Sequence, residues 1–156
     1  MTDKPIDELS DYSAQQRVIG VLAASAGDEL NALFETLKEV PDWQHLRPPE
    51  TGLIMVRGRV GGEGAPFNFG EVTVTRAAIT LTNGPTGFSY ALGRDRKKAE
   101  QAAIVHALWS VPGRTQEMET AILAPLEAKQ KQRDEKLAEE TAPTKVDFFT
   151  LMRGDD

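Results

Sequence analysis

Hydrophobic positions in the first forty residues follow the helical repeat. An apolar set that starts near Asp11 predicts a first helix, and residues 1–10 are expected to form a flexible, acidic lead-in. Gly27 ends this helix and Asp28 can cap a second one. The second helix has apolar side chains at i, i+3, i+4 and i+7, the spacing of one buried stripe: Leu30, Leu33, Phe34 and Leu37. Pro41 ends the pattern, so the two segments predict a helical hairpin.

The middle of the chain changes to the two-residue repeat of strands. A β-rich run, Leu53–Val60, ends in a glycine-rich turn, and apolar and polar positions then alternate over residues 71–82. The turn sequence of residues 83–87 separates this second strand from a short third one, residues 88–92. We expect an antiparallel meander of three strands, or of four if residues 43–46 add a short strand.

Helical patterning returns after residue 92. Asp95 is a good N-cap for a helix with a face of small residues, which ends at Pro112-Gly113. A further helix is predicted from Thr115 to Glu140, with a kink at Pro125, because proline lacks an amide donor. Nine of the fourteen residues in 127–140 are charged, so this half should be solvated or lie on a partner.

An apolar segment, Val146–Met152, follows this charged helix and needs a groove in which to bury itself. The fold expected from these patterns is α+β: a small antiparallel sheet of three to four strands, an N-terminal helical hairpin, two C-terminal helices and an extended apolar tail. Residues 11–140 would form a single domain after the lead-in of residues 1–10. Residues 141–156 would be a tail that docks on a partner subunit.

Composition narrows the chemistry. The chain has 156 residues, enough for one domain, and no cysteine, which excludes disulfides, thiolate metal sites and cysteine nucleophiles. A net charge of −6 argues against nucleic acid as a partner. No apolar run reaches the roughly 20 residues of a membrane span, and no signal peptide is visible. We therefore expect a cytoplasmic protein without membrane contact.

The net charge conceals a local excess of positive charge. Residues 47–98 carry eight Lys or Arg against four Asp or Glu, a net charge of +4, and nine of the thirteen glycines. Consecutive glycine amides can form an anion-binding nest, and arginine binds phosphate through two parallel hydrogen bonds. The glycines Gly61, Gly62 and Gly64, with Arg57, Arg59 and Arg76 near them, could therefore hold a phosphate. The simpler interpretation is a hairpin turn that uses glycine for its positive φ.

Two further groups have ordinary explanations. Arg94 opens a basic cluster at a helix start, where free amides attract anions, but a solvated basic face with Asp95 as the cap explains it as well. His106 shares a helical face with alanines, which favours a buried or interface histidine over a catalytic base. His45 stands in a predicted loop and is as poor a candidate.

Several stretches in order and spacing resemble one known family. They include Arg57–Glu71, with its glycine-rich turn, then Thr73–Arg76, Gly93-Arg94-Asp95, Leu123–Leu126, Val146–Thr150 and Met152-Arg153-Gly154. Together they resemble the PhnG family, a subunit of the bacterial carbon–phosphorus lyase core complex, over about residues 12–155. His106 departs from the family pattern, in which an acidic residue is common at this position.

The resemblance implies a role in phosphonate catabolism within a complex that holds two copies each of PhnG, PhnH, PhnI and PhnJ. With PhnI, PhnH and the ATPase-like PhnL, the family takes part in making α-D-ribose 1-methylphosphonate 5-triphosphate, a reaction in which methylphosphonate displaces adenine from ATP. PhnK-type ATPases also associate. PhnI is considered the catalytic subunit, so ATP would be a substrate of the complex, and we expect no catalytic residue, metal or bound cofactor in this chain.

The residues expected to contact substrate or partner are the basic and glycine positions of the middle segment: Arg57, Arg59, Gly61, Gly62, Gly64, Arg76 and Arg94. The expected anchors of the tail on a partner are Phe148, Phe149, Leu151 and Met152. The alternative function is a free-standing phosphate- or nucleotide-binding domain without catalysis of its own. The tail discriminates between the two, because a self-sufficient monomer should bury it in its own core.

Overall fold

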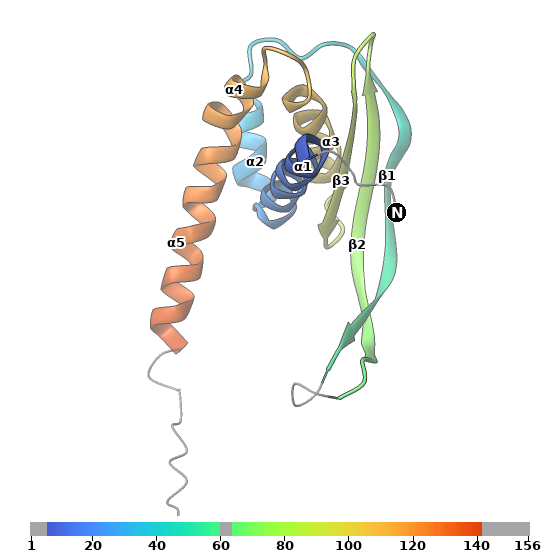
Figure 1. Cartoon of the computed structure of the whole chain (residues 1–156), viewed down its shortest axis with the longest axis vertical. Helices are drawn as coiled ribbons and strands as arrows, with labels where there is room; N and C mark the ends of the chain where they lie inside the picture. The colour runs from blue at the N-terminus through green and yellow to red at the C-terminus, as the bar shows by residue number, and fades with distance from the viewer. Residues whose placement is uncertain (1–5, 60–63, 142–156) are drawn as a thin grey trace, which may run out of the picture.

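The computed structural model describes residues 6–59 and 64–141, with side chains from residue 13 onward. The elements in chain order are α1 (Ile6–Ala24), α2 (Gly27–Phe34), β1 (Trp43–Gly58), β2 (Phe67–Leu81), β3 (Thr86–Leu92), α3 (Arg96–Trp109), α4 (Thr115–Met118), the π-helical turn η1 (Glu119–Leu123) and α5 (Ala124–Thr141). Helix α3 packs on β2 and β3, α1 also contacts β3, and α2 and α5 lie on the side away from the sheet (Figure 1). Among these elements no helix is both long and apolar enough to cross a bilayer.

The sheet confirms the predicted α+β fold and its antiparallel meander, with strand order β1-β2-β3. The segment near residues 43–46 is not a separate fourth strand, because β1 continues through Pro48-Pro49 to Gly58. The pairing of β1 with β2 shifts between His45 and Arg47 and again between Arg47 and Glu50. A strand at the sheet edge tolerates proline, since half of its amides have no partner strand to bind.

The first two strands are much longer than the third. β2 pairs with β3 only from Val74 onward, while β1 and β2 stay paired down to Gly58 and Phe67. Residues 53–58 and 67–73 therefore form a two-stranded extension, called the ribbon below, which projects past α1 and α3 in Figure 1. The sequence predicted strands in both segments but not their full length.

The core lies between α3 and one face of the sheet. The predicted alternation in β2 is confirmed, since Ala77, Ile79 and Leu81 are all buried in the cluster that includes α3. Close approach depends on small residues: a Cβ added at Gly87 would collide with the carbonyl oxygen of Ala103. Neighbouring Ser89 donates to the carbonyl of Ala99 at 2.6 Å, which also ties β3 to α3.

The helix starts differ in how well they were predicted. Asp95 caps α3 as expected, with its Oδ1 accepting from the amide of Lys98 at 2.9 Å. The Asp28 cap was wrong: α2 starts at Gly27 after Ala26, and the Asp28 carboxylate accepts only from the next amide, that of Glu29. α1 begins at Ile6 rather than near Asp11, so residues 6–10 of the expected lead-in are helical.

The C-terminal helix is continuous but changes its winding before Pro125. The predicted kink takes the form of the π-helical turn η1, which stands directly before the start of α5. A wider turn suits a proline, because its ring would clash with the carbonyl one turn back in a regular helix. Residues 131–141 are exposed, as the charge pattern predicted, and i,i+4 pairs such as Lys131–Glu135 line this half.

Candidate functional site

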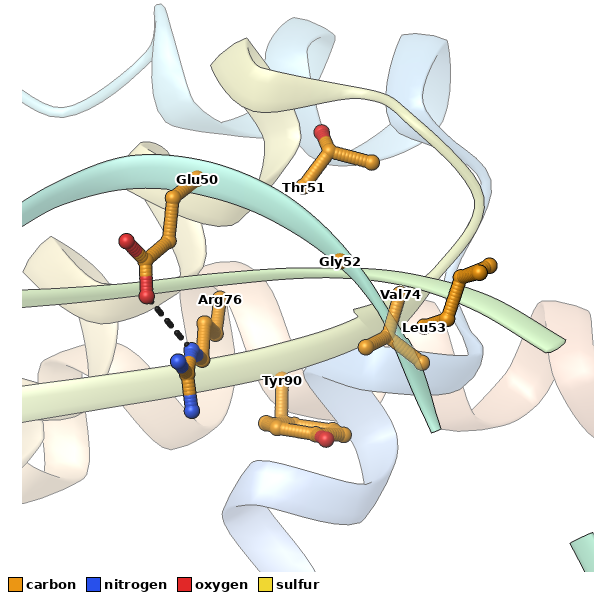
Figure 2. A pocket seen from close by; sticks show the side chains of 7 residues that line it. All are labelled: Glu50, Thr51, Gly52, Leu53, Val74, Arg76 and Tyr90. Carbon is orange, nitrogen blue, oxygen red and sulfur yellow. Dashed lines mark hydrogen bonds and ion pairs between the residues drawn. The ribbon is translucent and has the colours of Figure 1, made fainter. Parts of the chain in front are cut away.

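The face of the sheet turned away from α3 carries a row of polar side chains. Glu50 pairs with Arg76 across β1 and β2, and Arg76 pairs with Tyr90 across β2 and β3. The register therefore places these three residues side by side on three strands, as Figure 2 shows. This row comes from segments that are up to forty residues apart in sequence, and only the sheet brings it together.

In this row one carboxylate, that of Glu50, is paired with two arginines. The Glu50 carboxylate accepts from Arg76 Nε and from Arg47 Nη1, each at 2.7 Å. The hydrogen bond from Arg76, followed by that from Arg47, holds the pKa of Glu50 below its usual range. Two guanidinium groups on one carboxylate leave a net charge of +1. The terminal nitrogens of Arg76 make no other hydrogen bond in the described part of the chain, so they are available to an anion.

Three adjoining hollows open around this row. All three include Tyr90. The first, of about 230 Å³, lies between Glu50, Gly52 and Arg76 (Figure 2). A second, of about 330 Å³, is bordered by Arg47 and Phe88, and a third, of about 280 Å³, by Ile54 and Leu92, with α1 along one side of both. The result is an open surface with an arginine-rich end and an apolar end.

The groups that this surface offers are suited to binding. Among the described residues no three His, Asp or Glu side chains come close enough to hold a metal ion. Neither histidine ring hydrogen-bonds a hydroxyl group in residues 13–59 or 64–141. The available chemistry is recognition: arginine donors for an anionic group and aromatic and aliphatic side chains for an apolar one.

Both histidines are held in place by contacts within the fold. His106 is only 3% exposed, and its Nδ1 accepts from the amide of Phe88 at 3.0 Å. Burial lowers its pKa, so the ring is neutral with its proton on Nε2, which has no partner among the described residues. His45 lies 2.6 Å from a carboxylate oxygen of Glu100 and meets the Trp43 ring edge-on. The prediction that His106 is buried is confirmed.

The predicted arginines do not form one cluster. Arg76 lies in the row, but Arg57 is seven residues further along β1 than the Glu50 that pairs with Arg76. At about 3.3 Å per residue the separation is roughly 20 Å. Arg59 and Gly64 lie at the far end of the ribbon, on either side of residues 60–63, which are outside the described residues, and Arg94 follows β3 beside the Asp95 cap.

Some predicted positions cannot be placed, and some contributors were missed. Gly61 and Gly62, and the tail residues Phe148, Phe149, Leu151 and Met152, lie outside the described residues. Sequence reasoning missed Arg47, Glu50 and Tyr90 as neighbours of Arg76. The sequence indicated that Arg76 and Tyr90 lie in neighbouring strands. It did not show that they face each other, because that depends on the register between the strands.

Comparisons with known proteins give one consistent result. A family model described as "Phosphonate metabolism protein PhnG" matches residues 13–154. A curated relative from Rhizobium meliloti (strain 1021), "Alpha-D-ribose 1-methylphosphonate 5-triphosphate synthase subunit PhnG", is 41% identical over 148 residues, which cover 94% of each chain. The match thus includes the sheet, the helices and both the turn and tail segments singled out in the sequence.

Proposed function

The chain belongs to the PhnG family of phosphonate metabolism proteins, and on that basis we propose that it is a subunit of an α-D-ribose 1-methylphosphonate 5-triphosphate synthase. The observation that carries the proposal is the 41% identity to a subunit of that name across 94% of both chains. In the proposed reaction, the phosphonate oxygen attacks the ribose C1′ of ATP and adenine leaves.

The chain's own part in the synthase is support rather than bond making. Its candidate site is an open recognition surface, and its histidines are held by structural contacts. We propose that the reacting groups come from a PhnI-type subunit, that PhnH-, PhnJ-, PhnL- and PhnK-type chains are further partners, and that ATP is a substrate of the assembly rather than a cofactor of this chain. Two copies of this chain per assembly complete the proposal.

The test is reconstitution with and without this chain. The purified partner subunits are mixed with ATP and methylphosphonate, and released adenine and the triphosphate product are measured by chromatography. Full activity that requires addition of the chain supports the proposal. Equal product formation in its absence overturns it. Tight binding of ATP by the isolated chain would instead favour the free-standing nucleotide-binding domain.

Within that function, Arg76 and Arg47 are the groups we assign to an anionic part of the substrate or to the partner surface around it. A charge-assisted hydrogen bond contributes about 1.5–3 kcal/mol, so Arg76→Gln in the full complex should lower kcat/KM roughly tenfold or more. The matched control is Lys131→Gln, which removes an equally cationic but remote side chain on α5 and should leave kcat/KM unchanged. Unchanged assembly and activity for Arg76→Gln would contradict the assignment.

A further inference from the structure

β1 has a free edge along the ribbon. β2 pairs with one side of β1, and no strand in the described part of the chain pairs with the other side. An edge strand displays unpaired amides and carbonyls, which can add a strand from another chain. Proteins that remain monomeric usually block such edges with prolines, charges or bulges.

Most of the blocking features of β1 lie in its first half, and the third register shift, between Val56 and Arg57, lies near its end. Pro48 and Pro49 lie in the first half, together with two of the three register shifts and the charged side chains of Arg47 and Glu50. From Thr51 to Val56 the strand has neither a proline nor a charge, and its pairing with β2 is regular. The same strand is thus protected where α1 and α3 cover the sheet and unprotected where the ribbon projects beyond them (Figure 1).

The side chains of the ribbon are also more apolar than a solvated hairpin needs. Leu53 and Met55 are 62% and 52% exposed, and Phe67 and Phe69 on the paired strand are 42% and 62% exposed. The two phenylalanine rings stack on each other at 4.7 Å and leave their outer surfaces open. A two-stranded ribbon is marginal in water by itself, and a third strand or a covering surface is what normally stabilises it.

We propose that the β1 edge from Leu53 to Val56 pairs with an extended segment of a different protein chain. This inference rests on the proposed function, since it takes that chain to be another subunit of the synthase. The segment should be apolar at alternate positions, to cover Leu53 and Met55, and should carry carboxylates beyond them. The charge requirement comes from Arg57 and Arg59, which have no ion pair among the described residues.

The same charges argue against a second copy of this chain as the occupant. A second copy would bring two more unpaired arginines to the contact, with Glu71 as the carboxylate available on the described ribbon. An acidic segment of another chain neutralises both cations. Partners with complementary charge are favoured because like charges brought together at an interface oppose association.

The first test substitutes lysine on the ribbon. The double variant Leu53→Lys, Met55→Lys should fold, since both side chains are largely exposed, but should bind the partner subunits at least tenfold more weakly in co-purification and titration. The control is Leu46→Lys, on the same strand at 61% exposure, which should bind normally. Far-UV circular dichroism of the isolated variants checks the fold. Unweakened assembly of the double variant overturns the proposal.

Hydrogen exchange separates strand pairing from other kinds of contact. Pairing should slow exchange at alternate amides between residues 52 and 57 when the partners are added, because only every second amide of β1 points to the free edge. Slowed exchange confined to residues outside this segment overturns the proposal. So does a concentration-dependent dimer of the isolated chain that the lysine variant abolishes, since the occupant is then a second copy.

These outcomes are distinguishable from failure of the proposed function. If the synthase needs the chain but the lysine variant assembles and works normally, the function stands and the edge pairing fails. If the reconstituted partners make product without the chain, the proposed function fails whatever the ribbon binds.

Discussion

His106 shows at the residue scale how a buried polar ring is tolerated. One ring nitrogen is satisfied by the Phe88 amide, and the other has no partner among the described residues. A buried imidazole of this kind stays neutral, because charging it would require desolvating the cation. Its pKa is therefore depressed below 6.5, and the protonation equilibrium becomes linked to the stability of the fold.

The linkage predicts the direction of a pH effect. Because the folded pKa is below the unfolded one, the unfolded chain binds more proton between the two values. The free energy of unfolding should therefore fall as pH drops from about 6.5 toward the folded pKa, by up to about 1.4 kcal/mol per pH unit, and this contribution should be constant outside that window. Urea titrations from pH 7.5 to 5 measure it.

The two histidines supply the control for this prediction. His106→Gln keeps an acceptor for the Phe88 amide and should remove the slope, whereas His45→Gln, at the exposed contact with Glu100, should retain it. If the pH dependence of stability survives in His106→Gln and vanishes in His45→Gln, it arises from His45 and the prediction is wrong.

Residue roles were predictable where they depend on the local chain. Asp95 was identified as a cap because capping needs only the next three residues, and the bond to Lys98 confirms it. Asp28 was predicted as a cap on the same grounds but is not one, because the N-cap is Ala26, two residues earlier. The neighbours of Arg76 could not be predicted, since Glu50 and Tyr90 reach it through strand register, which no short window of sequence specifies.

At the element scale, strand and helix types were predicted well but their lengths were not. Residues 43–46 and 53–60 were expected to form separate strands, whereas the edge position of β1 allows one strand to continue through Pro48-Pro49. The π-helical turn before Pro125 was predicted only as a kink, because the sequence shows the missing amide but not how the preceding turn adapts. The approach of β3 to α3 depends on a single glycine in a turn-rich segment, Gly87.

That approach gives a prediction for Gly87→Ala. The new Cβ would collide with the Ala103 carbonyl oxygen and lie 2.7 Å from the Ala107 amide nitrogen, so β3 and α3 must separate. Overpacking of this kind costs about 1–3 kcal/mol, which should lower Tm by roughly 3–10 °C in a domain of this size. Thermal unfolding followed by circular dichroism measures it.

Gly20→Ala is the matched control. Gly20 lies inside α1, where an added methyl group would have nothing within 4 Å, and alanine favours a helix by about 1 kcal/mol over glycine. Its Tm should rise or stay unchanged. An equal loss of Tm in both variants would show that the collision at Gly87 is not the cause of the destabilisation.

At the scale of the whole molecule, two elements reach beyond the packed body. The ribbon projects from the sheet, and α5 projects from the helical side with its distal half exposed (Figure 1). α5 is anchored at its base, where Arg17 pairs with Glu119 and Glu127 and Arg133 pairs with Glu29. Beyond that base, ion pairs within the helix stabilise it in water, so its last residues lie away from the core.

The apolar segment Val146–Met152 comes after α5 in the sequence and lies outside the described residues. Its docking on a partner subunit therefore remains a prediction, and Phe148 and Phe149 are its proposed anchors. Fully burying a phenylalanine contributes about 1.5–3 kcal/mol, so Phe148→Ala with Phe149→Ala should weaken assembly by more than tenfold. Size-exclusion chromatography of the co-expressed subunits, with titration of the separated ones, measures the loss.

A control variant and the Tm of the isolated double variant together show whether the tail docks on a partner or on its own domain. Leu137→Ala truncates an apolar side chain that is 60% exposed on α5 and should leave assembly intact. If the phenylalanines dock on a partner, the double variant alone should unfold at the wild-type temperature, because its tail has no contact to lose. A drop in Tm of the isolated variant, with assembly unchanged, would place the tail on its own domain and remove the reason for expecting a partner there.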